Sequence, residues 1–68
     1  MENKQEILDR LCFALQATRD QEDLKKLLYD EEHEEVTICW DEGGTSVNVA
    51  MDSGIAMICD VMRAIRNN

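Results

Sequence analysis

Carboxylates dominate the residues that could do chemistry, and seven of them fall between positions 30 and 42 with no lysine or arginine among them. These acids are Asp30, Glu31, Glu32, Glu34, Glu35, Asp41 and Glu42. Several carboxylates on a rigid support focus a negative field, so such a run can dock a basic groove and imitate nucleic-acid phosphates. It can equally be a solvated loop that keeps a small apolar protein soluble. The regular acidic spacing of an EF-hand loop is absent, which disfavours a calcium site.

The thiols and the imidazole are too scattered to suggest a metal centre or a nucleophile. Cys12, Cys39 and Cys59 include no C-x-x-C pair and stand among apolar neighbours, so we expect buried, reduced thiols. A zinc site needs three or four ligands with settled spacing, and a catalytic cysteine needs a positioned histidine. The one histidine, His33, lies inside the acidic run, where neighbouring carboxylates should raise its pKa. We therefore expect no catalytic residue, no metal and no cofactor.

The last helix predicted along the chain is apolar around most of its circumference. Between residues 55 and 65 only Asp60 and Arg63 are polar, and at about 100° per residue they mark one narrow stripe. A surface helix of a small domain needs a single apolar stripe, so this helix should pack on two sides. The residues expected to mediate self-association are Met57, Ile58, Val61, Met62 and Ile65. A homodimer is therefore expected, with its interface on this helix or on the sheet.

The first and last helices follow from apolar spacing and capping residues. Apolar positions at i, i+3 and i+4 predict a helix over residues 4–17, after which the stripe fails. The last helix is expected over residues 54–66, and either Asp52 or Ser53 can be its N-cap.

A short second helix is predicted between these two. Leu24, Leu27 and Leu28 have the spacing of one helix face, and we place this helix over residues 20–29. The charge run that follows is expected to form a loop.

A β-hairpin is the clearest local pattern in the chain. Residues alternate in character over 36–40 and again over 47–51, and Gly43-Gly44 between them is a two-residue turn signal. This turn places Trp40 opposite Val47. The second face of the hairpin carries small uncharged residues, namely Thr37, Cys39, Ser46, Asn48 and Ala50. In a chain that is 32% charged, such a face should be either covered or used for an interaction.

Size and charge narrow the possible partners. The 68 residues form one domain, and a chain this short commonly gains stability from a partner subunit. A net charge of -8 repels nucleic acid and anionic membranes, whereas a basic protein is compatible with it. The N-terminal residues show no apolar signal core and no apolar stretch reaches about 18 residues, so a cytoplasmic location is expected.

Together these patterns predict a small α+β domain over residues 1–68 in the order ααββα, with a two-stranded antiparallel hairpin packed on helices. The expected function is that of an acidic, non-enzymatic module that binds a basic or nucleic-acid-binding protein and inhibits it. In size and acidity the chain resembles small inhibitor proteins of phages and mobile elements, such as the anti-CRISPR group, and the resemblance implies inhibition. The alternative is a dimeric small-ligand binder or enzyme whose site, lined by Thr37, Cys39, Ser46 and Asn48, forms between subunits.

Overall fold

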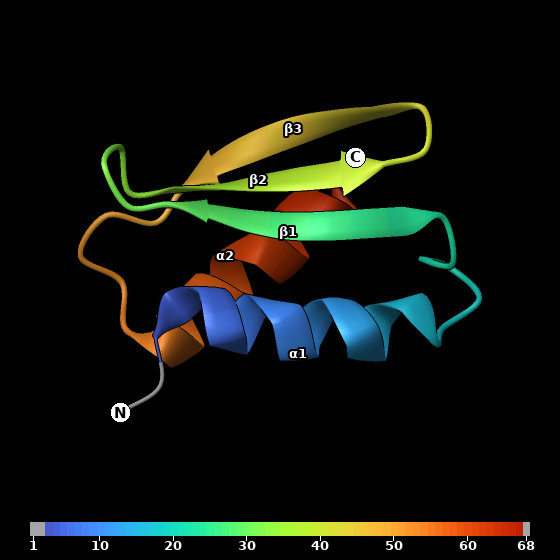
Figure 1. Ribbon diagram of the computed structural model, residues 1–68, viewed down its shortest axis with the longest axis horizontal. Coiled ribbons are helices and arrows are strands. Elements are labelled where there is room, and N and C mark those ends of the chain that lie inside the picture. Colours follow the sequence, from blue (N-terminus) through green and yellow to red (C-terminus); the bar gives the residue numbers. More distant parts are fainter. Residues whose placement is uncertain (1–2, 68) are drawn as a thin grey trace.

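The computed structural model describes residues 3–67, which form two helices and a three-stranded sheet (Figure 1). Along the chain the elements are α1 (Lys4–Gln16), β1 (Leu24–Asp30), β2 (Glu35–Trp40), β3 (Gly43–Asn48) and α2 (Gly54–Arg66). The α+β class is confirmed. The expected order ααββα is wrong, because a strand stands where the second helix was predicted, and the observed order is αβββα.

A β-bulge explains why β1 looks like a helix in the sequence. The pairing of β1 with β2 shifts between Leu24 and Lys26, so one extra residue is accommodated there. The bulge lets Leu24 and Leu27, three residues apart, both point into the core, where they are buried. Leu28 points to the opposite face and remains 44% exposed. An i, i+3 spacing of leucines therefore arises here from an irregular strand.

The hairpin of β2 and β3 exists, but its turn lies two residues before the predicted one. Asp41 and Glu42 form the turn, and Trp40 pairs with Gly43 instead of Val47. The shift is even, so the valines keep the faces predicted for them. Gly44 allows the two strands to approach, because a Cβ atom there would lie 2.8 Å from the backbone oxygen of Ile38.

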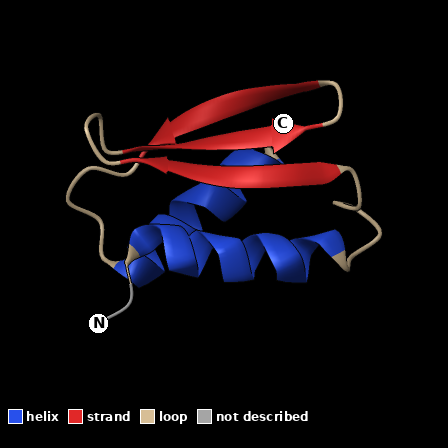
Figure 2. Ribbon diagram, in the orientation of Figure 1, coloured by secondary structure: helices blue, strands red, loops and turns tan. Residues whose placement is uncertain are grey.

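Both helices pack against the same face of the sheet, whose strand order is β1-β2-β3 with antiparallel neighbours (Figure 2). The core between the layers contains Leu8, Cys12, Leu15, Leu24, Leu27, Val36, Ile38, Val49, Met57, Val61 and Ile65. Helix α1 lies mainly under β1, and α2 lies under β2 and β3. Among residues 3–67, no helix lies over the other face of the sheet (Figure 2).

Side-chain caps begin both helices. Asn3 accepts a hydrogen bond from the backbone nitrogen of Glu6 at 2.8 Å, and Ser53 accepts one from that of Ala56 at 3.2 Å. Ser53 is thus the N-cap of α2, one of the two candidates. Within residues 3–67, neither helix is long and apolar enough to cross a membrane.

Candidate protein-binding surface

The face of the sheet that points away from both helices is called the open face. Strand pairing arranges its residues in three rows, each crossing from β1 through β2 to β3. The rows are Lys26–Cys39–Gly44, Leu28–Thr37–Ser46 and Asp30–Glu35–Asn48. The middle row is uncharged, whereas the third row contains two acids, Asp30 and Glu35. The open face is therefore a small-residue surface with a negative border.

Four of the five residues predicted for the second face of the hairpin lie on the open face. Thr37 and Cys39 are half-buried in the central strand, and Ser46 and Asn48 are exposed in β3. Ala50 lies beyond the end of β3. Within residues 3–67 no helix covers this face, and its use as an interaction surface stays a prediction.

The acidic residues are divided between two ends of the sheet. Five of them, from Asp30 to Glu35, occupy the β1–β2 loop and its flanks. Asp41 and Glu42 form the β2–β3 turn, which lies at the opposite end of β2. At about 3.3 Å per strand residue the two groups stand roughly 15–20 Å apart. The structure therefore does not bring all seven acids into one patch, and the β1–β2 group, hereafter the acidic loop (residues 30–35), is the denser one.

Asp30 gives the acidic loop a defined shape. Its Oδ1 accepts hydrogen bonds from the backbone nitrogens of Glu32 at 3.0 Å and His33 at 3.2 Å, while Oδ2 lies 2.8 Å from His33 Nδ1. These bonds lower the pKa of Asp30, chiefly through the His33 side chain, and the same contact raises the pKa of His33. Glu34 closes the loop with a left-handed φ of 51°. The remaining glutamates are therefore presented from an ordered turn.

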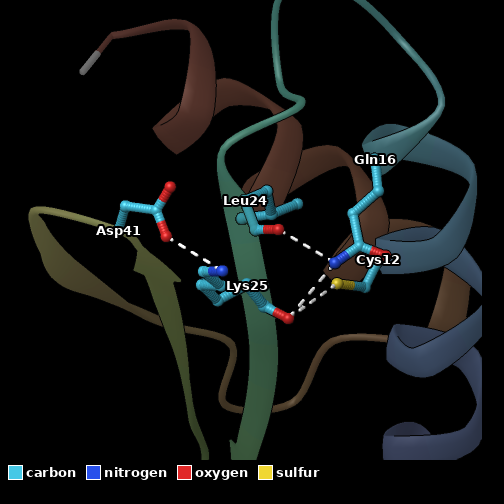
Figure 3. A network of polar contacts seen from close by, with 5 residues as sticks. All are labelled: Cys12, Gln16, Leu24, Lys25 and Asp41. Carbon is cyan, nitrogen blue, oxygen red and sulfur yellow. Dashed lines mark hydrogen bonds and ion pairs between the residues drawn. The ribbon is translucent and has the colours of Figure 1, made fainter.

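The second acidic group is partly neutralised by a lysine. Lys25 Nζ lies 3.0 Å from Asp41 Oδ1, with both side chains more than half exposed (Figure 3). Exposed pairs of this kind contribute only about 0–1 kcal/mol to stability, yet they reduce the local negative field. The acidic loop has a basic partner in His33, which is charged only when protonated.

Polar side chains of α1 cover the free edge of β1, a role that the sequence did not reveal. Gln16 Nε2 donates to the backbone oxygen of Leu24 at 2.9 Å, and Cys12 Sγ lies 3.7 Å from that of Lys25 (Figure 3). Gln5 donates to the oxygen of Leu27 at 2.9 Å and accepts from the nitrogen of Tyr29 at 2.8 Å. Gln5 and Gln16 look like ordinary surface residues of an amphipathic helix until β1 is known to be a strand.

The residues predicted for self-association are divided between the core and the helix flank. Met57, Val61 and Ile65 are buried inside one molecule, while Ile58 and Met62 are half-buried. Large apolar side chains are exposed elsewhere, at Phe13 (79%), Met51 (96%) and Ile55 (78%). Most of the predicted set is thus occupied in holding α2 to the sheet.

The three thiols are free, and burial differs between them. Cys12 is buried, which raises its pKa, whereas Cys39 is half-buried and Cys59 is exposed. The expectation of three buried thiols is therefore correct only for Cys12. Within residues 3–67 no three histidine, cysteine or acidic side chains are placed to hold a metal ion.

Asp52 and Asp60 form an acid pair that sequence spacing did not predict. Hydrogen bonding to Asp60 is the main cause of a raised pKa of Asp52, followed by partial burial. Asp52 Oδ2 is shielded from solvent and has no donor when both groups are ionised. A proton on Asp52 supplies a donor between the two side chains, and this agrees with the raised pKa of Asp52.

Comparison of the chain with protein-family models finds no matching family, and neither the curated proteins nor the solved structures contain a significant match.

Proposed function

We propose that this chain is a small, acidic, non-enzymatic module that binds a basic protein, with the acidic loop and the open face as its contact surface. The observation that carries the proposal is the position of the loop. Its glutamates project from a turn fixed by Asp30, directly beside the third row of the open face. Carboxylates held in this way keep their field focused and lose little conformational freedom when a partner binds.

The two parts of this surface have different tasks in binding. The acidic loop attracts a basic partner over about one Debye length, which speeds association. The open face then supplies the short-range contact, with Leu28 as its one large apolar side chain and Thr37 beside it. Lys26 and Asn48 provide polar groups at the border. If the partner binds nucleic acid through its basic groove, occupation of that groove by the acidic loop makes the module an inhibitor.

Site-specific photo-crosslinking in the native cells tests whether the open face is the contact surface. A photoreactive amino acid replaces Thr37 at the centre of the open face, and a matched variant carries it at exposed Ala14 on α1. We expect Thr37 to trap a discrete basic protein and Ala14 to trap none, with recovery falling as salt is raised during capture. Equal crosslinking from both positions, or a partner without a basic surface, contradicts the proposal.

A further inference from the structure

The two edge strands of the sheet, β1 and β3, differ in how their outward-facing backbone groups are covered. At the β1 edge, Gln5, Cys12 and Gln16 of α1 bind the backbone groups that face away from β2. This is one of the ways in which proteins prevent further strands from joining a sheet. Strand β3 forms the opposite edge, and α2 lies beneath it on the core side.

The register identifies the groups at the β3 edge. In an antiparallel pair, every second residue exchanges hydrogen bonds with its partner strand and the residues between point away. The Val49 nitrogen donates a hydrogen bond of 2.9 Å to the Glu34 oxygen. The odd-numbered residues of β3 therefore direct their backbone groups toward β2. The backbone groups of Gly44, Ser46 and Asn48 therefore face outward from the sheet.

Strand β3 also lacks the usual deterrents against pairing. Its sequence, Gly-Gly-Thr-Ser-Val-Asn, contains no charged residue and no proline. The side chains of Ser46 and Asn48 on the open face are small, and Asn48 Oδ1 is turned back to accept a bond from the Ala50 nitrogen at 3.0 Å. Nothing on the strand itself therefore obstructs another strand.

We propose that a second copy of this chain joins the β3 edge in antiparallel orientation, so that two three-stranded sheets become one continuous sheet. The two-fold axis passes beside Ser46, which pairs with the partner's Ser46. Gly44 then pairs with the partner's Asn48, and each outward-facing residue meets another one. About six hydrogen bonds form across the junction.

A second copy fits this edge because the strand is complementary to itself about Ser46. On the core side, Thr45 comes opposite the partner's Val47, which is a favourable uncharged pair. Asp41 and Glu42 do not meet their own counterparts, since they lie opposite the partner's Met51 and Ala50. Two molecules that each carry a charge of -8 can approach best where both surfaces are uncharged, and β3 is such a segment. This interface uses the sheet, one of the two places predicted for the dimer, and not the residues named on the last helix. It leaves the acidic loops available to partners.

Sedimentation equilibrium of the whole chain and of edge variants tests the proposal. Ser46→Pro removes an outward N–H that β2 does not use, and Ser46→Lys places like charges opposite each other across the axis. Each variant should weaken the dimer about tenfold or more, because the symmetry applies the change twice. Thr37→Lys on the central strand and Ile55→Lys on α2 are the matched controls and should leave the dimer intact. Circular dichroism verifies that each variant is folded.

Two outcomes overturn the proposal. One is a mass of 7.8 kDa for the parent chain throughout a titration into the hundred-micromolar range. The other is a dimer that survives both Ser46 variants but is lost in Ile55→Lys, since that result places the interface on α2. As a second measurement, Ser46→Cys in a Cys59→Ser background should oxidise readily to a linked dimer, because directly paired residues have Cα atoms about 5.5 Å apart. Failure of these thiols to link in a folded dimer also contradicts the pairing.

Discussion

At the scale of single residues, the acid pair of Asp52 and Asp60 opposes folding at neutral pH. The pKa of Asp52 is raised in the folded chain, so the folded state binds more protons than the unfolded one, and stability falls as the pH rises through that pKa. Asp52→Asn should therefore increase the melting temperature at pH 7, because the amide can donate to Asp60 without binding a proton. The gain should shrink as the pH falls below the ordinary carboxyl range. Thermal melts across this range measure it, and a gain that does not depend on pH would refute the explanation.

The contact between Asp30 and His33 stabilises the folded chain, and the contributions of the two residues change with pH in opposite directions. Because the pKa of His33 is raised, its stabilisation is complete below the unfolded value and is lost as the pH rises through the folded one. The lowered pKa of Asp30 means that its stabilisation holds above the unfolded value and is lost as the pH falls through the folded one. The pair therefore stabilises the acidic loop mainly in mildly acidic solution.

A proton NMR titration of His33 tests this contact directly. Asp30→Asn keeps an oxygen for the loop amides but removes the carboxylate, so the pKa of His33 should fall toward its ordinary value. Asp41→Asn makes the same change of net charge at the other end of the sheet and should leave the titration nearly unchanged. Equal shifts in both variants would mean that net charge, and not this contact, sets the pKa.

At the scale of elements, the close approach of β2 and β3 depends on Gly44. A Cβ atom at this position would lie 2.8 Å from a backbone oxygen, which cannot move without disturbing the hairpin. Gly44→Ala should cost about 1–3 kcal/mol, the usual range for overpacking. Gly54→Ala is the control, because its Cβ meets only the flexible end of Ile7 at 3.1 Å. Urea unfolding compares the stabilities of the two variants. Equal losses would contradict the claim that the close approach of β2 and β3 requires a glycine at position 44.

The covering of the β1 edge by α1 can be tested at one amide. Gln5 accepts from the nitrogen of Tyr29 at 2.8 Å, so Gln5→Ala should expose this group and accelerate its hydrogen exchange. The lost bonds should also destabilise the chain by about 1–2 kcal/mol. Glu6→Ala changes an exposed neighbour on the same helix and should preserve the protection of Tyr29. Unchanged exchange in Gln5→Ala would show that another group protects the edge.

The same elements show how far sequence reasoning reaches. The helical spacing and the Ser53 cap predict α1 and α2 well because they depend on near neighbours. Residues 20–29 were assigned to a helix because a bulge gives leucines the spacing of one. The hairpin register was wrong because Gly43-Gly44 resembles a turn, whereas Gly44 is needed for contact with Ile38 across the sheet. Contacts between distant residues decide both cases, and local patterns do not contain them.

The candidate surface was anticipated only in part for the same reason. Four of the five residues predicted for the small-residue face of the hairpin lie on it, since alternation along a strand survives an even shift of register. Leu28 and Lys26 were missed because they join that face only when β1 is a strand. The separation of Asp41 and Glu42 from the acidic loop follows from the length of β2, and the strand predicted over residues 36–40 already implies it.

At the scale of the whole molecule, excess negative charge should oppose the folded state slightly. Replacement of Glu31, Glu32, Glu34 and Glu35 by glutamine changes the net charge from -8 to -4 and relieves repulsion within the loop. The melting temperature should stay the same or increase a little at low salt, with a smaller difference at high salt. A clear loss of stability would show that these glutamates hold the fold and would complicate their use in binding tests.

The central claim is that the acidic loop docks a basic protein. Its most direct test is the rate at which the partner identified by crosslinking associates with this loop variant and with a charge-matched control. The control carries Glu6→Gln, Asp9→Asn, Asp20→Asn and Glu22→Gln, which also change the net charge from -8 to -4 but lie outside the acidic loop. Stopped-flow measurements at low and physiological salt should show a large loss of association rate for the loop variant and a small loss for the control. Equal losses in the two variants would contradict a docking role for the acidic loop and leave the run as a device for solubility.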